Sequence, residues 1–259
     1  MFFKNLKIEL KTAREIEKIR VAGRIVGEIL EKLSEIIEPN ITTQDVNIFV
    51  EKYIKSVKMT PAFLGVKGMS CPFPASACVS VNDEVVHGIP NASRVLKEGD
   101  IVSVDIGVLY EGYYGDGAKT YAVGKISDIA SKLLKVTEMS LENGIKQALA
   151  GNRLGDISYG VQEAVEKEGF SVVRDFVGHG IGRALHEDPQ IPNYGKAKTG
   201  IKLLSGMILA IEPMVNVGSH EVVMLDDNWT VVTKDGSLSA HFEHTVAITE
   251  HDYEILTKV

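Results

Sequence analysis

The sequence predicts an α+β protein made of two related halves. Stretches with helical periodicity precede stretches rich in Val and Ile, and this order occurs twice along the 259 residues. Each half also contains a short strand-like run, "GDIVSVD" at 99–105 and "GMILAIE" at 206–212, that starts at a glycine and reaches a carboxylate six residues later. We therefore expect the strands of both halves to lie inside and the helices outside.

The first half should begin with two helices. From 12 to 37, apolar residues recur at the three- and four-residue spacing that is typical of an amphipathic helix. The stretch "EPNITTQD" interrupts this pattern, and Thr42 or Thr43 can cap a second helix at about 44–57. A similar break, "AGNRLGDI", precedes a helix of the second half, which supports the interpretation as a repeat.

Strands follow in the first half. Val and Ile are frequent at 76–87 and at 101–106, which indicates a strand in each range. The stretch "LYEGYYGD" is typical of a hairpin that turns around Glu111 and Gly112.

The second half repeats this order. Helices are expected at about 128–149 and 155–168, and strands from 171 onward. Because no linker or low-complexity stretch divides the chain, we expect a single domain over 1–259.

Charge and composition exclude several classes of partner. The formal net charge of −7 gives no basic footprint for nucleic acid, and the short groups of lysines are typical of a solvated surface. The stretch "MFFKNLKIELKTAREIEKIR" lacks the apolar run of a signal peptide, and no segment suits a membrane span. With only Cys71 and Cys78, and no export signal, a structural disulfide is not expected. We expect a cytoplasmic protein.

Carboxylates fall on the small-residue faces of two expected strands. Alternation along "IVSVDI" places Asp105 on the same face as Ser103. Alternation along "ILAIE" places Glu212 on the same face as Ala210. In both strands the small residue leaves room beside the acid. The same arrangement at matching places of a repeat predicts a cleft on the axis that relates the halves.

Asp116 is a third acid of this kind and follows the hairpin turn. Asp105 and Asp116 are nearly symmetric about the turn, so we expect them to face each other across adjacent strands, with Cβ atoms about 5 Å apart. Two bare carboxylates at that separation repel each other, and one of them would stay protonated. A divalent cation between them removes this conflict.

A fourth acid and an imidazole complete the candidate set. In "SAHFEHTVAIT", alternation places Glu243 and His241 on the inward face. His179 stands between two glycines, which leave room for a metal and for another backbone to approach. Oxygen ligands with one imidazole suit Mn, Fe(II), Co or Zn, and two such ions about 3.5–4 Å apart suit hydrolysis.

At this point the residues match a known family. The matching segments are "NDEVVHGIP" (82–90), "GDIVSVDIG" (99–107), "GYYGDGAKT" (112–120), "FVGHGIGRALHEDPQIPNY" (176–194), "LAIEPM" (209–214) and "SLSAHFEHT" (237–245). With them the chain resembles the type I methionine aminopeptidases, which have the pita-bread fold, over essentially its whole length. The resemblance implies two pseudo-symmetric halves with an inner antiparallel sheet and outer helices. Only 32 residues separate His179 from Glu212, too few for the helical insertion of the type II enzymes.

The resemblance implies a role for each site residue. The five metal-ligand positions of the family fall on Asp105, Asp116, His179, Glu212 and Glu243. They would hold two divalent metal ions, with Asp116 and Glu243 bridging the pair. Glu212 would also act as general base. His186 would contact the substrate carbonyl, and His87 the nitrogen of the scissile amide.

The same resemblance implies an activity and its partners. Members of the family remove the N-terminal methionine from peptides and nascent proteins, preferably when the second residue is small. A water activated by the two metal ions attacks the scissile carbonyl. We therefore expect Met-peptides and nascent chains as substrates, the ribosome as a partner, no nucleic acid or membrane partner, and a monomeric enzyme.

A pocket that selects methionine should be apolar. By resemblance its candidates are Phe63, Phe73, Cys78, Leu185 and Trp229, although plain core packing explains each of them equally well. Cys78 is more typical of a small hydrophobic residue on a strand than of a nucleophile. His241 is a candidate for the pocket or for contact with a metal ligand. The stretch 63–76 should border the pocket.

Two other interpretations stay open. Xaa-Pro dipeptidases and aminopeptidase P share the fold and the five ligands, but they usually carry an additional N-terminal domain. A non-catalytic relative would use the fold for binding and would have lost ligands, whereas all five positions and both histidines are present here.

Overall fold

The structure is a computed structural model that describes residues 7–68 and 70–259. Its α-helices lie at the predicted places. Two of them, Ala13–Ile36 (α1) and Thr43–Ser56 (α2), belong to the first half. Asp128–Ile145 (α3) and Leu154–Glu166 (α4) belong to the second, and α3 ends four residues before the predicted boundary.

Side-chain caps explain where the first two helices begin. The Thr12 side chain accepts the backbone N–H of Glu15, while the Glu15 carboxylate accepts the backbone N–H of Thr12. Thr42 and Asp45 make the same reciprocal pair at the start of α2. These capping boxes satisfy backbone donors that a helix leaves without partners in its first turn. Of the two threonines that could cap α2, Thr42 is therefore the one that does.

Strands fill the remainder of both halves. Their bounds are Thr60–Pro61 (β1), Cys78–Val81 (β2), Glu84–Val86 (β3), Ile101–Tyr110 (β4), Tyr113–Ala122 (β5), Ser171–Val172 (β6), Gly178–Gly180 (β7), Glu187–Ile191 (β8), Ile208–Ile211 (β9), Met214–Asn216 (β10), Val222–Met224 (β11), Val231–Thr233 (β12), Ser239–His241 (β13), Glu243–Ile248 (β14) and Tyr253–Ile255 (β15).

A long hairpin, β4–β5, dominates the first half. The two strands pair antiparallel from Ile101 opposite Ala122 to Tyr110 opposite Tyr113, so β4 extends beyond the predicted 101–106. Glu111 and Gly112 form the turn at φ angles of 46° and 82°. Two successive left-handed residues match the twist of a two-residue hairpin, which confirms the predicted turn.

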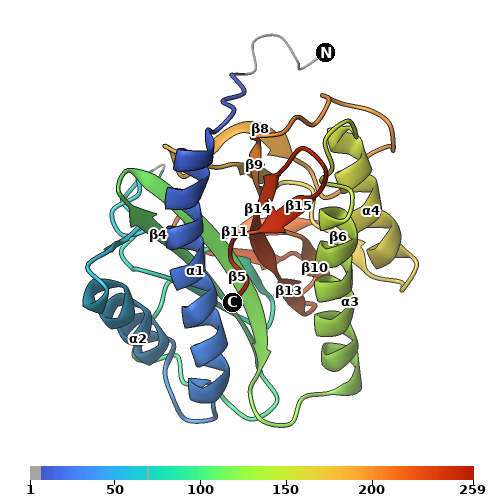
Figure 1. The fold of residues 1–259 in the computed structure, drawn as a ribbon. Helices are drawn as coiled ribbons and strands as arrows, with labels where there is room; N and C mark the ends of the chain where they lie inside the picture. Colours follow the sequence, from blue (N-terminus) through green and yellow to red (C-terminus); the bar gives the residue numbers. More distant parts are fainter. Residues whose placement is uncertain (1–6, 69) are drawn as a thin grey trace.

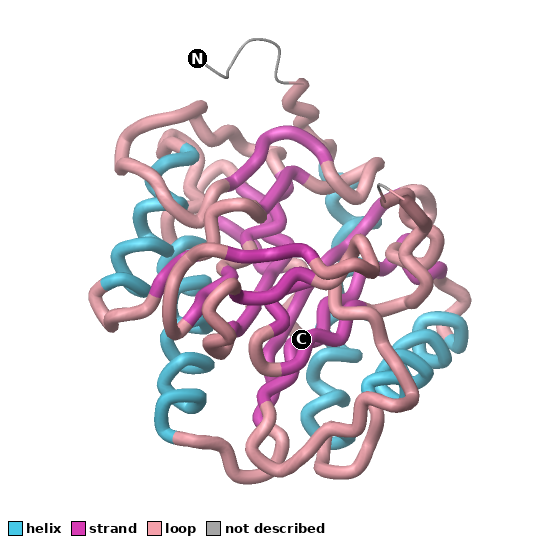
Figure 2. The backbone as a smooth tube through the Cα atoms, turned by 180° about the vertical axis from the view of Figure 1, so that it is seen from behind, coloured by secondary structure: helices cyan, strands magenta, loops and turns pink. Residues whose placement is uncertain are grey.

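One antiparallel sheet runs through both halves. Its strand order is β1-β4-β5-β14-β9-β7-β8, and the pairing of β5 with β14 joins the halves at the centre. In Figure 1, α1 lies in front of the β4–β5 hairpin and α3 lies on the side of the second half. Strands and loops make up most of the opposite face (Figure 2). This arrangement confirms the expected inner sheet and outer helices.

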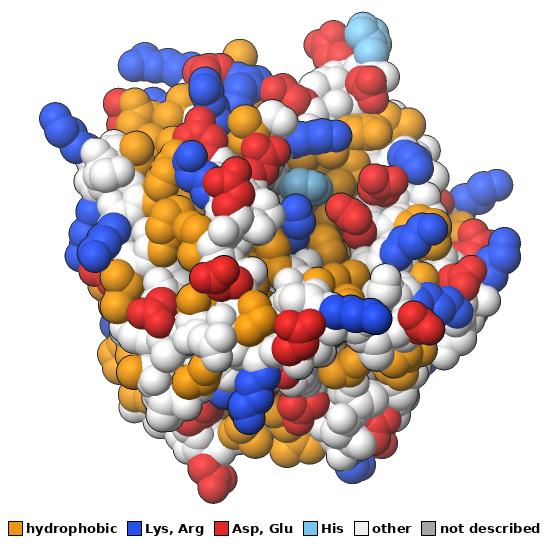
Figure 3. All heavy atoms as spheres, turned by 90° about the horizontal axis from the view of Figure 1, so that it is seen from below, with side chains coloured by type: hydrophobic (Ala, Val, Ile, Leu, Met, Phe, Trp, Pro, Cys, Tyr) orange, Lys and Arg blue, Asp and Glu red, His pale blue; other side chains and the backbone are white. Residues whose placement is uncertain are grey.

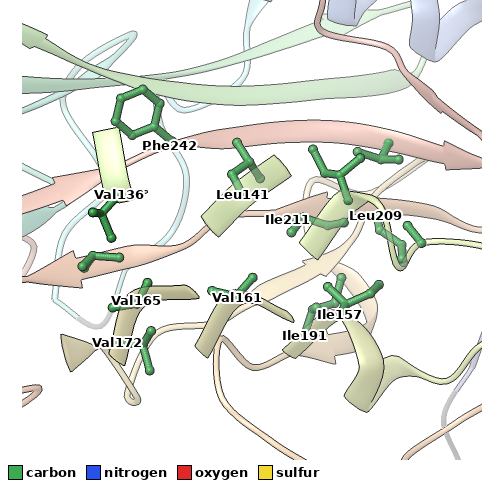
Figure 4. Packing of buried hydrophobic residues seen from close by; sticks show 14 of the residues in the cluster. Val136, Leu141, Ile157, Val161, Val165, Val172, Ile191, Leu209, Ile211 and Phe242 are labelled. Carbon is green, nitrogen blue, oxygen red and sulfur yellow. The ribbon is translucent and has the colours of Figure 1, made fainter. Parts of the chain in front are cut away.

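Each half has its own apolar core between helices and sheet. In the first half, Val102, Val104 and Ile106 of β4 join one cluster with residues of α1 and α2. In the second half, Leu209 and Ile211 of β9 join residues of α3 and α4 (Figure 4). The faces predicted by alternation are therefore correct, because these strand residues turn away from the side that carries Asp105 and Glu212.

The described surface is mixed in charge. Seen from below (Figure 3), Lys and Arg side chains are interspersed with Asp and Glu side chains and with apolar ones. Within residues 7–68 and 70–259, no helix is long and apolar enough to cross a membrane.

Candidate metal centre

A cavity of about 840 Å³ opens on the inner side of the sheet. All four predicted carboxylates line it, together with three of the histidines. These residues are Asp105, Asp116, Glu212, Glu243, His87, His179 and His186. The structure therefore brings together side chains that are spread over more than half of the sequence.

Neighbouring strands deliver the acids and the imidazole to one place. Asp105 comes from β4, Asp116 from β5, and Glu243 from the start of β14, which pairs with β5. Glu212 directly follows β9, the other neighbour of β14. His179 lies in β7, opposite Ala210 of β9. The candidate metal centre therefore lies where the two halves meet, at the pairing of β5 with β14.

One predicted detail is wrong. Asp105 lies opposite Ala118, and Asp116 lies opposite Gly107, so the two acids are diagonal neighbours instead of a directly opposed pair. The hairpin turn is centred between Glu111 and Gly112, one residue beyond the midpoint of the two aspartates. Diagonal positions on one face are about 7–8 Å apart at the backbone, which leaves space for a third ligand between them.

Three of the candidate ligands form the tightest group. Ligand atoms of Asp116, His179 and Glu243 all lie within 4.8 Å of one another. The His179 Nε2 atom lies 3.9 Å from Asp116 Oδ2 and 3.6 Å from Glu212 Oε1. These separations are too long for hydrogen bonds but suit groups arranged around an ion.

The His179 ring is held with one nitrogen toward the carboxylates. Its Nδ1 atom lies 2.9 Å from the backbone oxygen of Gly180, to which it donates when protonated there. That hydrogen bond leaves the Nε2 lone pair free to act as a ligand. Burial lowers the His179 pKa to about 3, so the imidazole is neutral near pH 7.

The glycines beside His179 serve the close packing of strands. A Cβ atom at Gly178 would lie 2.4 Å from the backbone oxygen of Ala210, and one at Gly180 would lie 2.2 Å from that of Asp188. The prediction that another backbone approaches here is therefore correct. The room that the glycines leave is filled by neighbouring strands.

The chemistry of the donor set fits a divalent cation. Among the described residues, Asp105 Oδ1 and Glu243 Oε1 are buried without a hydrogen-bond partner. Burial raises the pKa of Asp105 to about 7 and that of Glu212 to about 8. Burial and neighbouring carboxylates also raise the pKa values of Asp116 and Glu243 well above the ordinary range. Clustered acids that cannot ionise together are stabilised when a cation lies among them.

We expect the metal-free protein to become less stable as pH rises from 7 to 8. The folded protein holds protons on Asp105 and Glu212, whereas both carboxyls are ionised in the unfolded chain above about pH 5. Because the folded state binds more protons, the free energy of unfolding falls by about 1 kcal/mol over this pH unit for Glu212, and by less for Asp105, which is already about half ionised at pH 7. Histidines with lowered pKa values offset part of this decline, by roughly 0.1 kcal/mol each, because about a quarter of each histidine is protonated at pH 7 in the unfolded chain.

Urea denaturation at pH 7 and pH 8 measures this effect, with a chelator or with excess Mn²⁺. Excess metal should abolish the decline, since the ligands are then ionised at both pH values. Equal stability of the metal-free protein at the two pH values would contradict the expectation.

Two further histidines border the same cavity. The His186 ring packs edge-to-face on the His179 ring, with centroids 4.5 Å apart. His87 adopts a left-handed backbone conformation with φ 60°. Its ring contacts Phe176 and Trp229 edge-to-face, at centroid distances of 5.7 and 6.0 Å.

The five predicted pocket residues, Phe63, Phe73, Cys78, Leu185 and Trp229, all line the cavity. The rings of Phe73 and Trp229 contact each other edge-to-face at 5.1 Å. Cys78 lies opposite Asp105 in the sheet, and burial raises its thiol pKa well above the ordinary value. A thiol that stays protonated packs as a small apolar group, as expected for Cys78.

His241 lies behind the cavity wall instead of on it. The residue is almost fully buried, and its Nε2 atom is 3.5 Å from Glu212 Oε2. Of its two predicted places, contact with a candidate metal ligand is therefore the one observed. Three apolar lining residues, Phe176, Met214 and Met224, were not predicted individually. Met214 follows Glu212 by two residues, so continued alternation would have placed it on the same side.

Clustered carboxylates around a neutral imidazole, in a cavity that also has apolar lining residues, are typical of a metal-dependent hydrolase. Comparisons with known proteins give the class more closely. Residues 17–250 match the sequence profile of metallopeptidase family M24. The chain belongs to this family.

Curated relatives and solved structures support this assignment. The methionine aminopeptidase 1 of Bacillus subtilis is 55% identical over 249 residues, covering 96% of this chain and 98% of that protein. The crystal structure of the methionine aminopeptidase from Thermotoga maritima matches with a TM-score of 0.94 and 51% identity, covering 98% of this chain and all of that one. An Xaa-Pro dipeptidase from Bacillus anthracis shares the fold, with a TM-score of 0.75 at 22% identity, but this chain covers only 62% of its length.

Proposed function

We propose that the protein is a methionine aminopeptidase that removes the N-terminal methionine from peptides and nascent chains. One observation carries this proposal: four carboxylates and His179 converge in one cavity that also has a set of aromatic and aliphatic lining residues. The relatives named methionine aminopeptidase, which match over nearly the full length of both chains, support the same activity.

Five side chains would hold two divalent metal ions, chosen among Co, Mn, Fe(II) and Zn. Asp116 and Glu243 would bridge the ions, which their place in the tightest group of ligand atoms supports. Asp105 would chelate one ion, and His179 with Glu212 would complete the other. When bound, such ions polarise a carbonyl and bring the pKa of a water close to neutrality.

Glu212 would be the general base of the reaction. It accepts the proton of the attacking water and then delivers this proton to the leaving amine. Its carboxylate lies at the cavity wall, within 3.6 Å of His179 Nε2 and 3.5 Å of His241 Nε2. The two imidazoles flank the carboxylate without hydrogen-bonding it, so its oxygens stay available to a metal ion and to the attacking water.

The two other histidines would act on the substrate. His186 donates a hydrogen bond to the carbonyl oxygen as this oxygen becomes negative. His87 contacts the scissile nitrogen. Aromatic contacts to Phe176 and Trp229 hold the His87 ring, so it is oriented before the substrate arrives.

The methionine side chain would lie against the apolar wall. Phe63, Phe73, Cys78, Leu185 and Trp229 supply this wall, and the packed rings of Phe73 and Trp229 support its shape. The family preference for a small second residue belongs to the proposal. So do a single catalytic domain over 1–259, a monomeric state, a cytoplasmic location and action on nascent chains at the ribosome.

Release of methionine from Met-Ala-Ser tests the proposal directly. The purified protein, stripped of metal and then supplied separately with Co²⁺, Mn²⁺, Fe²⁺ or Zn²⁺, should cleave this peptide and leave Ala-Pro intact. Cleavage of Ala-Pro without release of methionine would instead assign the protein to the Xaa-Pro peptidases. No cleavage of either peptide with any metal would refute both activities.

A further inference from the structure

We infer that Lys11 positions His186 through a buried ion pair with Glu187. Lys11 lies in the segment before α1, and its effect on catalysis rests on the proposed function. The loop 181–186 connects His179 of β7 to His186, whose ring packs on the ring of His179. His186 is exposed, and no residue of the described chain hydrogen-bonds its ring. The shape of the loop therefore determines where this imidazole stands.

The Glu187 carboxylate folds back onto this loop. Its Oε1 atom accepts the backbone N–H of Arg183 at 2.6 Å and that of Ala184 at 3.0 Å. Its Oε2 atom accepts a hydrogen bond from Lys11 Nζ at 2.7 Å. Because Glu187 directly follows His186, one carboxylate ties the end of the loop to its middle and to a segment 176 residues away.

Lys11 is buried to a degree that is unusual for lysine. Its side chain is 3% exposed and that of Glu187 is 14% exposed. Lysine side chains are almost never buried unless they are paired. The Lys11 backbone is also fixed, since its N–H donates to the carbonyl of Gly206 at 2.7 Å. The ammonium group is therefore presented to the loop from a rigid support.

The loop backbone lies directly against this ion pair. A Cβ atom at Gly182 would stand 2.2 Å from Lys11 Cε and 2.9 Å from Glu187 Oε1, so a side chain cannot be added there without displacing the pair. The Gly182 carbonyl accepts the backbone N–H of Tyr114, two residues before Asp116 in β5. The loop is thus held between the lysine and the strand that carries a candidate metal ligand.

A second, exposed ion pair links the same parts of the chain. Arg183 Nη2 lies 3.0 Å from Glu15 Oε1, but the Arg183 side chain is 63% exposed. Exposed ion pairs contribute little, whereas removing one partner of a buried pair leaves a charge without compensation. Without Lys11, Glu187 would turn toward water and release the two backbone N–H groups. His186 would then lose its fixed place.

Lys11→Met tests the inference, because it keeps the length and apolar stem of the side chain and removes the charge. We expect kcat for a Met-peptide to fall about 10- to 100-fold, with KM and Co²⁺ affinity by calorimetry within about twofold of wild type. The double variant Lys11→Met/Glu187→Gln removes both charges and keeps an oxygen for the two N–H groups, so it should recover most of kcat. An unchanged kcat in Lys11→Met would overturn the inference.

A double-mutant cycle that combines Lys11→Met with His186→Ala distinguishes positioning of His186 from a general loss of structure. In the His186→Ala background, Lys11→Met should lower kcat by less than about twofold, since the residue that it positions is gone. An equal fall in both backgrounds would overturn the inference. Lys18→Met, which breaks the pair of the partly exposed Lys18 with the exposed Glu111, is the control and should leave kcat unchanged.

A readout without catalysis distinguishes failure of this inference from failure of the proposed function. If the wild-type protein itself releases no methionine, the proposed function fails. NMR of the histidine rings in the metal-free protein then still tests whether Lys11 positions His186. Ring resonances of His186, assigned by their loss in His186→Ala, should shift in Lys11→Met and stay in place in Lys18→Met. Unshifted resonances in Lys11→Met would overturn the inference.

Discussion

Glu212→Gln is expected to lower kcat for a Met-peptide by about 10²- to 10⁴-fold at saturating metal. The substitution keeps the size of the side chain and one oxygen that can face a cation, but the amide cannot take a proton from water. The Glu212 carboxylate lies between two imidazoles, 3.6 Å from His179 Nε2 and 3.5 Å from His241 Nε2. Steady-state kinetics with bound metal measured in the same samples gives the result.

The control for this prediction is Glu221→Gln, the same chemical change at an exposed position. Glu221 pairs with Lys234 on the surface, so its loss should leave kcat within about twofold. Metal occupancy is the second quantity to measure, because a variant that binds less metal would be slow for lack of metal and not for lack of a general base. The raised pKa of Glu212 shows that this carboxyl and the metal ion depend on each other. Near-normal turnover of the fully loaded Glu212→Gln variant would contradict the role of general base.

His179→Ala and His186→Ala should fail in different ways, although the two rings touch. His179 presents Nε2 to the carboxylates, so its loss should weaken metal binding by more than about 100-fold, beyond the usual cost of removing a group that only supports a ligand. His186 does not belong to the group of ligand atoms that lie within 4.8 Å of one another, and it is exposed. Its loss should keep the metal and lower kcat by about 10²- to 10³-fold.

Calorimetric titration with Co²⁺ and kinetics at saturating metal separate the two effects. His251→Ala, which removes an exposed histidine that does not line the cavity, is the control and should change neither quantity. Equal metal affinities for His179→Ala and His186→Ala would contradict the assignment of His179 as the only imidazole ligand.

Alternation along strands was enough to predict which acids face the site. It placed Asp105 and Glu212 opposite the apolar faces of their strands, and both line the cavity. It could not give the pairing register of β4 with β5, because a hairpin shifted by one residue at its turn moves every cross-strand partner. The diagonal relation of Asp105 and Asp116 follows from where the turn falls, at Glu111 and Gly112.

Other features depend on contacts between distant parts of the chain. The glycines beside His179 were interpreted as space for a metal and for another backbone, and the sequence alone could not show that the space is taken by the backbones of Ala210 and Asp188. The burial of Lys11 has no signal in its own segment, because its partner lies 176 residues away. Alternation placed His241 on the inward side of its strand. Whether its ring lies on the cavity wall or behind it depends on contacts with distant segments, which alternation does not give.

The seam between β5 and β14 has a consequence for synthesis of the protein. Four of the five proposed ligand positions have been made once the ribosome passes residue 212, but the last one, Glu243, arrives with the strand that fills the gap between β5 and β9. Domains begin to fold from the N-terminus during translation, so the first half can form its core early. Until β14 emerges, β5 and β9 each have an open edge toward the gap, which is a site for aberrant pairing with other chains. A chain interrupted before this strand therefore lacks the last proposed ligand and the strand that joins β5 to β9, and we expect it to aggregate or to be degraded more readily than the full chain.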